Sequence, residues 1–179
     1  RVWQVVPAGQ RPEAPAWVIG SLVHQALALW RFPGADFAPW VWARAREFGL
    51  TDAKQLAHAQ TESARLLQRF RRSALFQEMD QADQRLPEVP YSYLVNGRVQ
   101  TGYIDMLYEQ AGSWTLVDFK TDHVGSEADL QRLLSQTDYT QQLRQYGRAV
   151  QQLLGITPRL KLCLLNYGRE VRLIDVAAN

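Results

Sequence analysis

The feature that most constrains the fold of this 179-residue chain is a change in hydrophobic period close to Pro87. Before it, apolar residues such as Val18 and Leu22 recur at helical spacing. After it, short runs rich in β-branched and aromatic residues alternate with turn residues. We therefore expect one domain over the whole chain, with a mainly helical part over residues 1–80 and a sheet-containing part over residues 81–179.

The sheet-containing part predicts an antiparallel meander followed by a helix and two further strands. Asn96-Gly97 is a strong hairpin turn, and Gly112 lies at the centre of the next turn. A helix that begins at Asp138 or Thr140 is expected to end at Gly155, and residues 125–135 form a loop or a short helix. The expected strands are residues 89–95, 99–108 and 114–120 in the meander, residues 159–166 beside it, and residues 170–176 at the edge.

The first part predicts helices after an irregular, proline-containing lead-in over residues 1–16. The third helix is capped by Thr51 or Asp52 and is expected to break near Ser73. The expected helices are residues 16–29, 35–50 and 52–80.

Composition excludes several classes of protein. A hydrophobic content of 46% and six tryptophans indicate a folded globular chain, and no apolar run is long enough to cross a membrane. Cys163 is the only cysteine, which excludes an internal disulfide and a four-cysteine iron–sulfur cluster and favours a reducing compartment. A net charge of +2 permits nucleic-acid binding only through a local basic surface. Because the chain begins at Arg1 rather than Met, we expect it to be part of a longer chain.

Two acids and a lysine in the meander suggest chemistry. Asp118 and Lys120 are two residues apart on one expected strand, so their side chains share a face. Asp105 lies on the neighbouring strand and is expected opposite Asp118. Converging carboxylates repel one another, and Mg²⁺ or Mn²⁺ would relieve that repulsion, with the backbone carbonyl of Phe119 as a further ligand. A lysine beside such a site suits metal-assisted hydrolysis of a phosphodiester.

Other polar residues are open to two interpretations. His24 lies one helical turn after Gly20, a spacing that fits a structural histidine as well as a functional one. Two arginine stripes fit either solvated helix faces or contacts with phosphates. These stripes are Arg65, Arg69 and Arg72 on one helix, and Arg144 and Arg148 on another.

Five short motifs follow one another in an order that carries a resemblance. Each is weak alone, but together they span residues 19–146. They are Ile19-Gly20-Ser21-Leu22-Val23-His24, Glu88-Val89-Pro90-Tyr91, Gly102-Tyr103-Ile104-Asp105, Val117-Asp118-Phe119-Lys120-Thr121, and Gln142 through Tyr146 as Q-x-x-x-Y. The chain resembles the RecB-like branch of the PD-(D/E)XK nuclease superfamily, and within it most resembles the C-terminal nuclease domains of bacterial AddA and RecB helicase–nucleases.

The resemblance implies a role for each matching residue. Asp105 and Asp118 match metal-binding acids, Lys120 the catalytic lysine, and His24 a histidine that also contacts the metal. Glu88 matches a supporting acid. Gln142 and Tyr146 match a helix pair that orders the active site and contacts DNA. Ile104 stands where the superfamily has its nominal proline, which is ordinary for this branch.

The resemblance also implies a fold and a setting. The fold is α/β (α+β), with a restriction-endonuclease-like core in which helices flank a mixed sheet. The expected activity is Mg²⁺-dependent hydrolysis of DNA, with Mn²⁺ as a substitute, on single strands during end processing in repair and recombination, by an exonuclease-type reaction. The expected partner is an ATP-dependent helicase motor, and the expected location is the bacterial cytoplasm.

Two alternatives stay open. The chain is either a nuclease or a catalytically inactive DNA-binding or scaffolding module on the same fold. A restriction-like endonuclease that acts on duplex sites is a third reading. Asp122 and His123, which follow the catalytic motif, are read as loop residues.

Overall fold

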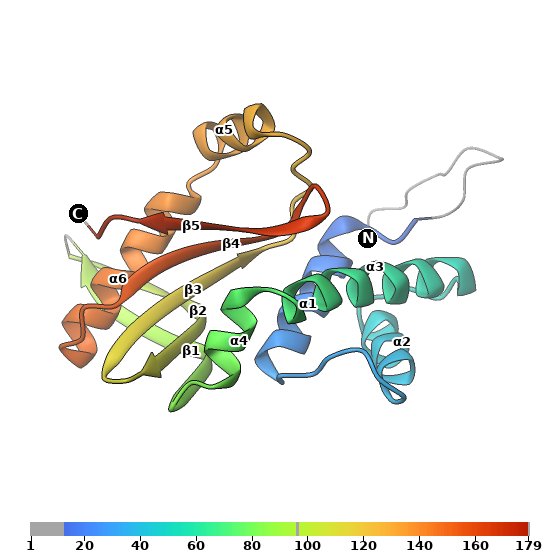
Figure 1. The fold of residues 1–179 in the computed structure, drawn as a ribbon, viewed down its shortest axis with the longest axis horizontal. Coiled ribbons are helices and arrows are strands. Elements are labelled where there is room, and N and C mark those ends of the chain that lie inside the picture. The colour runs from blue at the N-terminus through green and yellow to red at the C-terminus, as the bar shows by residue number, and fades with distance from the viewer. Residues whose placement is uncertain (1–12, 96, 179) are drawn as a thin grey trace.

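The computed structural model describes residues 13–95 and 97–178. Six helices and five strands follow one another in these residues, and Figure 1 shows the helices around a single sheet. The helices are α1 (Ala16–Ala28), α2 (Phe37–Glu47), α3 (Ala53–Arg71), α4 (Ala74–Asp80), α5 (Glu127–Gln136) and α6 (Tyr139–Leu154). The strands are β1 (Gln84–Val95), β2 (Arg98–Gln110), β3 (Ser113–Lys120), β4 (Arg159–Tyr167) and β5 (Glu170–Val176).

The sheet is mixed, as predicted. Its strands lie in the order β1-β2-β3-β4-β5. The pairs β1–β2, β2–β3 and β4–β5 are antiparallel, whereas β3 and β4 are parallel. Parallel neighbours need a long crossover, and here α5 and α6 supply it. The meander, the added strand and the edge hairpin are therefore confirmed.

Two apolar cores lie on opposite faces of the sheet. The first packs α1 to α4 against β2, β3 and β4 through residues such as Phe70, Tyr108 and Phe119. The second packs α6 against the other face through residues such as Leu143 and Leu116. In Figure 1 the helices α1 to α3 gather at one end of the sheet and α6 lies across it. The ends of β2 and β3 are thus enclosed between both groups of helices.

Local signals place most of the boundaries. The Asp52 carboxylate accepts hydrogen bonds from the backbone N–H groups of Lys54 and Gln55 and caps α3. The Ser73 hydroxyl accepts from the N–H of Phe76 and starts α4, so the predicted break is confirmed. Gly155 ends α6 in a left-handed conformation at φ 69°.

Several expected boundaries were wrong. β1 begins at Gln84 rather than at residue 89, so it includes Pro87. β2 is also longer than expected at both ends, and residues 127–136 form a full helix with Ser126 as its cap. The lead-in over residues 1–12 and Asn96 of the hairpin turn lie outside the described residues. None of the helices in the part of the chain that the structure describes is long and apolar enough to cross a membrane.

Candidate active site

The sheet opens between β2 and β3 where the two acids lie. The ladder between these strands stops at the pair Met106–Val117. That register, extended by one residue, sets Asp105 opposite Asp118, as predicted. On its other side β3 stays paired with β4 as far as Lys120. The backbone of β3 is therefore held on one side and free to accept other partners on the other.

Asp105 joins three elements. Its Oδ2 accepts a hydrogen bond from the backbone N–H of Phe119 at 2.8 Å, which replaces a ladder bond that the opened sheet lacks. Its Oδ1 lies 3.2 Å from Nδ1 of His24, which α1 carries. The alternation of side chains along β2 breaks here, because Ile104 packs on the α6 side while Met106 packs on the side of α1 to α4. This break lets Asp105 reach helix α1 and strand β3 together.

His24 is charged by its surroundings. Burial opposes protonation of the imidazole, but the contact with Asp105 and the negative charges of Asp105 and Asp118 outweigh it. The pKa of His24 is consequently raised above its ordinary value. His24 is thus an electrostatic partner of the two acids rather than a neutral core residue.

Asp118 is almost fully buried, with 2% of its surface exposed. Nζ of Lys120 lies 2.8 Å from its Oδ2, but the angles of this contact do not satisfy hydrogen-bond geometry, so Oδ2 has no hydrogen-bond donor. Burial raises the pKa of Asp118 to about 6, opposed by the charge of Lys120 and reinforced by that of Asp105. A buried carboxylate oxygen without a donor is costly and calls for a cation.

Lys120 is held by α6 from the other side. Its Nζ donates to Oε1 of Gln142 at 3.1 Å and lies 4.4 Å from the ring centroid of Tyr139. The Tyr139 hydroxyl donates to Asp122 at 3.0 Å, and burial together with Asp122 raises the pKa of Tyr139 to about 12. The first turn of α6 therefore positions the lysine. Tyr139 was missed in the sequence, although it lies three residues before Gln142 and so shares its face.

Tyr146 has a packing role that links three of the motifs. It is buried, and its ring lies 5.5 Å from that of Tyr91 on β1. Tyr91 in turn lies over Gly102, its partner in the β1–β2 ladder, where a Cβ atom would stand only 2.7 Å from the tyrosine oxygen. Gly102 thus makes room for the aromatic pair that seats α6 on the sheet.

Glu88 lies beside the acids on the neighbouring strand. The flanking pairs Pro87–Met106 and Val89–Ile104 place it opposite Asp105, and its backbone has φ 50°, which is unusual for a residue with a side chain. Glu88 shares a hollow of about 570 Å³ with Asp105 and His24. Trp17, which is 58% exposed, lines the same hollow and was missed in the sequence because its position on α1 resembles that of a surface residue.

The arginine stripes are divided among different surroundings. Arg65 and Arg69 both donate to Oδ1 of Asn166, at 3.2 and 3.0 Å, and Arg65 also pairs with Glu62. Arg65 still lines a hollow beside the site, together with Gly20 and Thr121. The remaining three lie elsewhere: Arg72 lines a hollow at the start of α4, Arg144 donates to the carbonyl of Ala177, and Arg148 lines a hollow along α6. Their contact with phosphates stays a prediction.

The donors for a cation are neighbours, but they do not form a closed set. Within residues 13–95 and 97–178, no three His, Cys, Asp or Glu side chains converge closely enough to hold a metal ion. His24 instead meets Asp105, and Lys120 meets Asp118. The Asp118 Oδ2 that lacks a donor nevertheless fits a divalent cation, since oxygen ligands are those that Mg²⁺ and Mn²⁺ prefer.

Two curated relatives match the chain, and both are ATP-dependent helicase/nuclease subunits of the same name. The chain is 28% identical over 170 residues to the one from Heliobacterium modesticaldum, covering 86% of this chain and 12% of the relative. It is 38% identical over 73 residues to the one from Lachnoclostridium phytofermentans, covering 40% of this chain and 5% of the relative. The chain therefore spans only a small part of the length of these relatives.

A solved structure and a family profile agree on the fold. The structure of a candidate exonuclease from Eubacterium rectale superposes with a TM-score of 0.62 at 16% identity, covering 94% of this chain and 61% of that one. The profile of the PD-(D/E)XK nuclease superfamily matches residues 3–170. On this match, with the acids and lysine on adjacent strands of the mixed sheet, the chain belongs to the PD-(D/E)XK nuclease superfamily.

Proposed function

We propose that this domain is a divalent-metal-dependent deoxyribonuclease that hydrolyses phosphodiester bonds of single-stranded DNA from an end. The observation that carries the proposal is the environment of Asp118. A buried carboxylate oxygen without a hydrogen-bond donor lies 2.8 Å from a lysine and opposite a second acid. A purely structural ion pair would gain from complete hydrogen bonding, whereas this one leaves an oxygen for a cation.

Asp105, Asp118, the backbone carbonyl of Phe119 and His24 would hold the cation, Mg²⁺ or in its place Mn²⁺. When bound, such an ion supplies Lewis-acid stabilisation of the negative charge on the phosphodiester. Glu88 lies opposite Asp105 and supports the negative potential that attracts the ion.

Lys120 acts on the reacting groups. Released from Asp118, its ammonium group would orient the attacking water and stabilise the charge that develops on the phosphate. Gln142 and Tyr139 hold Lys120 from the α6 side, so they position the lysine through every change at Asp118. Tyr146 fixes α6 against β1 and thereby fixes Gln142.

The names of the curated relatives suggest the setting. Both are ATP-dependent helicase/nuclease subunits from bacteria, and this chain matches a small part of each. We therefore place the activity beside an ATP-dependent helicase motor in the bacterial cytoplasm, where it would trim DNA ends for repair and recombination.

The test is cleavage of a labelled single-stranded oligonucleotide with Mg²⁺ or Mn²⁺. Chelator should abolish cleavage, and Asp118→Ala and Lys120→Ala should each reduce it by at least about 100-fold. Lys54→Ala, at an exposed lysine of α3, is the matched control and should cut like the parent protein. A circular single strand should resist, because it has no end. If both site variants cut as fast as the parent, the site is wrong.

One observation favours a second candidate, a catalytically inactive DNA-binding or scaffolding module. His24 and Lys120 occupy the acids directly, and no ready metal cluster lies within the described residues. Titration with Mn²⁺ in a calorimeter separates the two candidates. Binding that Asp118→Ala removes supports the nuclease, while the absence of binding by the parent protein supports the inactive module.

A further inference from the structure

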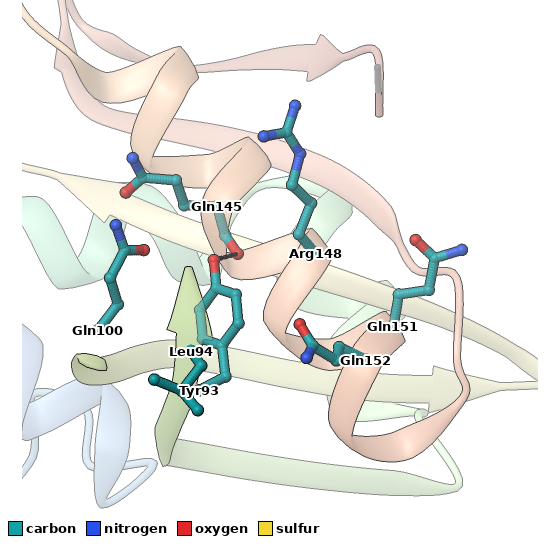
Figure 2. A pocket seen from close by; sticks show the side chains of 7 residues that line it. All are labelled: Tyr93, Leu94, Gln100, Gln145, Arg148, Gln151 and Gln152. Atoms are coloured by element: carbon teal, nitrogen blue, oxygen red, sulfur yellow. Dashed lines mark hydrogen bonds between the residues drawn. The ribbon is translucent and has the colours of Figure 1, made fainter. Parts of the chain in front are cut away.

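A second recess lies between the β1–β2 hairpin and α6. It measures about 490 Å³. Figure 2 shows its walls, with Tyr93 and Leu94 on β1 facing the polar side chains of α6. The hydroxyl of Tyr93 donates to the backbone carbonyl of Gln145 at 3.4 Å and joins the two walls. We call this recess the amide groove, after the side chains that line it.

The lining has an unusual chemistry for a surface recess. Four of its seven residues are glutamines and one is an arginine, and no carboxylate is among them; the glutamines are Gln100, Gln145, Gln151 and Gln152, beside Arg148. Helix α6 as a whole carries neither Asp nor Glu. Amides offer both donors and acceptors to base edges, and a guanidinium suits a phosphate. Acidic side chains, which would repel a polyanion, are missing from this lining.

The amide groove is continuous with the candidate active site. A second hollow of about 390 Å³ is lined by Asp138, Tyr139, Gln141, Gln142 and Gln145. It shares Gln145 with the amide groove, and its Gln142 and Tyr139 contact Lys120. A single polar surface along α6 therefore leads from the lysine to the hairpin.

We infer that the amide groove binds the single-stranded DNA that extends from the scissile phosphodiester, with glutamine amides on base edges and Arg148 beside the backbone. This rests on the proposed function, since it extends the substrate path of the same site. The exposed apolar side chains of Leu94, at 64%, and Val99, at 65%, lie on the hairpin that forms one wall and give bases a surface to cover.

The dimensions set a length requirement for the DNA. From Gln142 to Gln152 the helix rises about 15 Å, which corresponds to about four stacked nucleotides. A strand of about 4 nucleotides placed at the active site would not fill the groove, whereas one of about 12 would pass through it. The groove therefore predicts an affinity that rises with length.

The test is binding by fluorescence anisotropy in the presence of chelator, with labelled strands of these two lengths. The parent should bind the longer strand at least about tenfold more tightly, the size expected for one stacked base. The variant Gln100→Glu/Gln152→Glu puts a charge on each wall with little change of shape, and should lose this gain while its affinity for the shorter strand stays unchanged. Both residues lie outside the catalytic set.

The matched control is Gln68→Glu/Gln77→Glu, which adds the same charge on exposed positions of α3 and α4. It should keep the gain with length. The inference is overturned if the groove variant binds the longer strand as the parent does, if the control loses as much, or if a duplex of equal length depends on the groove to the same degree.

Cleavage of the shorter strand with Mn²⁺ separates this inference from the proposed function. Cleavage by the parent together with an unaffected groove variant leaves the nuclease standing and removes the groove. A parent that cuts neither strand but shows the groove-dependent gain with length removes the nuclease and keeps the groove as a DNA site.

Discussion

Asp105 accepts the backbone N–H of Phe119 at 2.8 Å, so a side chain of β2 completes the hydrogen bonding of β3 where the sheet opens. The same carboxylate meets His24 through its other oxygen. Asp105 is thus both a structural clamp between two strands and a member of the candidate site. These two roles make different demands on the side chain, and substitution can separate them.

Asp105→Asn and Asp105→Ala should therefore differ in stability but not in activity. The asparagine keeps an oxygen for the Phe119 N–H, whereas alanine leaves that buried group unsatisfied, at a cost of about 1–3 kcal/mol. Both variants should lose cleavage because both lose the charge. Urea unfolding followed by circular dichroism measures the first effect. Asp175→Asn, at an exposed position of β5, is the control, and equal stabilities of the two Asp105 variants would contradict the clamp.

The buried charge of Asp118 should make folding depend on pH. Its pKa in the folded protein is raised to about 6, against about 3.9 in an unfolded chain. A raised carboxyl pKa means that the stabilising contribution is fully present below about pH 3.9 and is lost as pH rises through about 6. In chelator-treated protein, the unfolding free energy of Asp118→Asn should gain on that of the parent by about 3 kcal/mol between pH 4 and pH 7.5.

The measurement is urea unfolding of both proteins across that pH range. The difference between the two free energies is the informative quantity, because it cancels the other titrating groups. A difference that stays constant with pH would mean that Asp118 is not held in a costly ionised state. Asp122→Asn, at an exposed loop carboxylate, shows what an ordinary acid contributes.

Much of the fold follows from local signals in the sequence. Asp52, Ser73 and Gly155 end or begin helices by hydrogen bonds and backbone conformations that depend on neighbours in the chain. The extent of β1 does not, because Pro87 and Pro90 resemble strand breakers. β1 is an edge strand that pairs only with β2, so prolines without an N–H are tolerated there.

The candidate site divides in the same way. The opposition of Asp105 and Asp118 follows from their spacing around one turn, and Gln142 and Tyr146 follow from helical period. Tyr139 and Trp17 do not, because their roles arise from where α6 and α1 dock on the sheet. Only the three-dimensional packing places an aromatic ring 4.4 Å from the lysine ammonium.

Gln142 should act as a positioning residue for Lys120. Its Oε1 accepts from Nζ at 3.1 Å, so Gln142→Leu should lower kcat by about 10–100-fold with little change in KM, because the lysine loses its direction rather than its charge. Gln141→Leu, at the neighbouring exposed position, is the control. Equal loss in both variants, or a change confined to KM, would assign Gln142 to substrate binding instead.

Gly20 should be needed for the geometry after Lys120 rather than for the stability of α1. A Cβ atom at position 20 would stand 3.1 Å from Oγ1 of Thr121, while Gly→Ala within a helix usually contributes about 1 kcal/mol of stability. We expect Gly20→Ala to fold with similar stability but to cut several-fold more slowly. Adding Thr121→Ala, which removes the opposing oxygen, should restore most of the rate in a double-mutant cycle. Failure of the second substitution to restore it would show that Thr121 is not the cause.

Gly102 should be essential for seating α6. A Cβ atom there would stand 2.7 to 2.9 Å from three atoms of the Tyr91 ring, and that ring supports Tyr146. Gly102→Ala should therefore destabilise the fold by about 1–3 kcal/mol through overpacking and should also slow cleavage, since Tyr146 and Gln142 share one face of α6. Thermal unfolding and cleavage are measured together.

The companion variant is Tyr91→Ala with Gly102→Ala, which removes the ring that the new methyl group would meet. If the overlap is the cause, the double variant should be no less stable than Tyr91→Ala alone, because the methyl group then meets no ring. It should still cut slowly, because Tyr146 has lost its support. Recovery of stability without recovery of cleavage would show that Gly102 acts on the site through the Tyr91–Tyr146 pair, and additive losses of stability would contradict it.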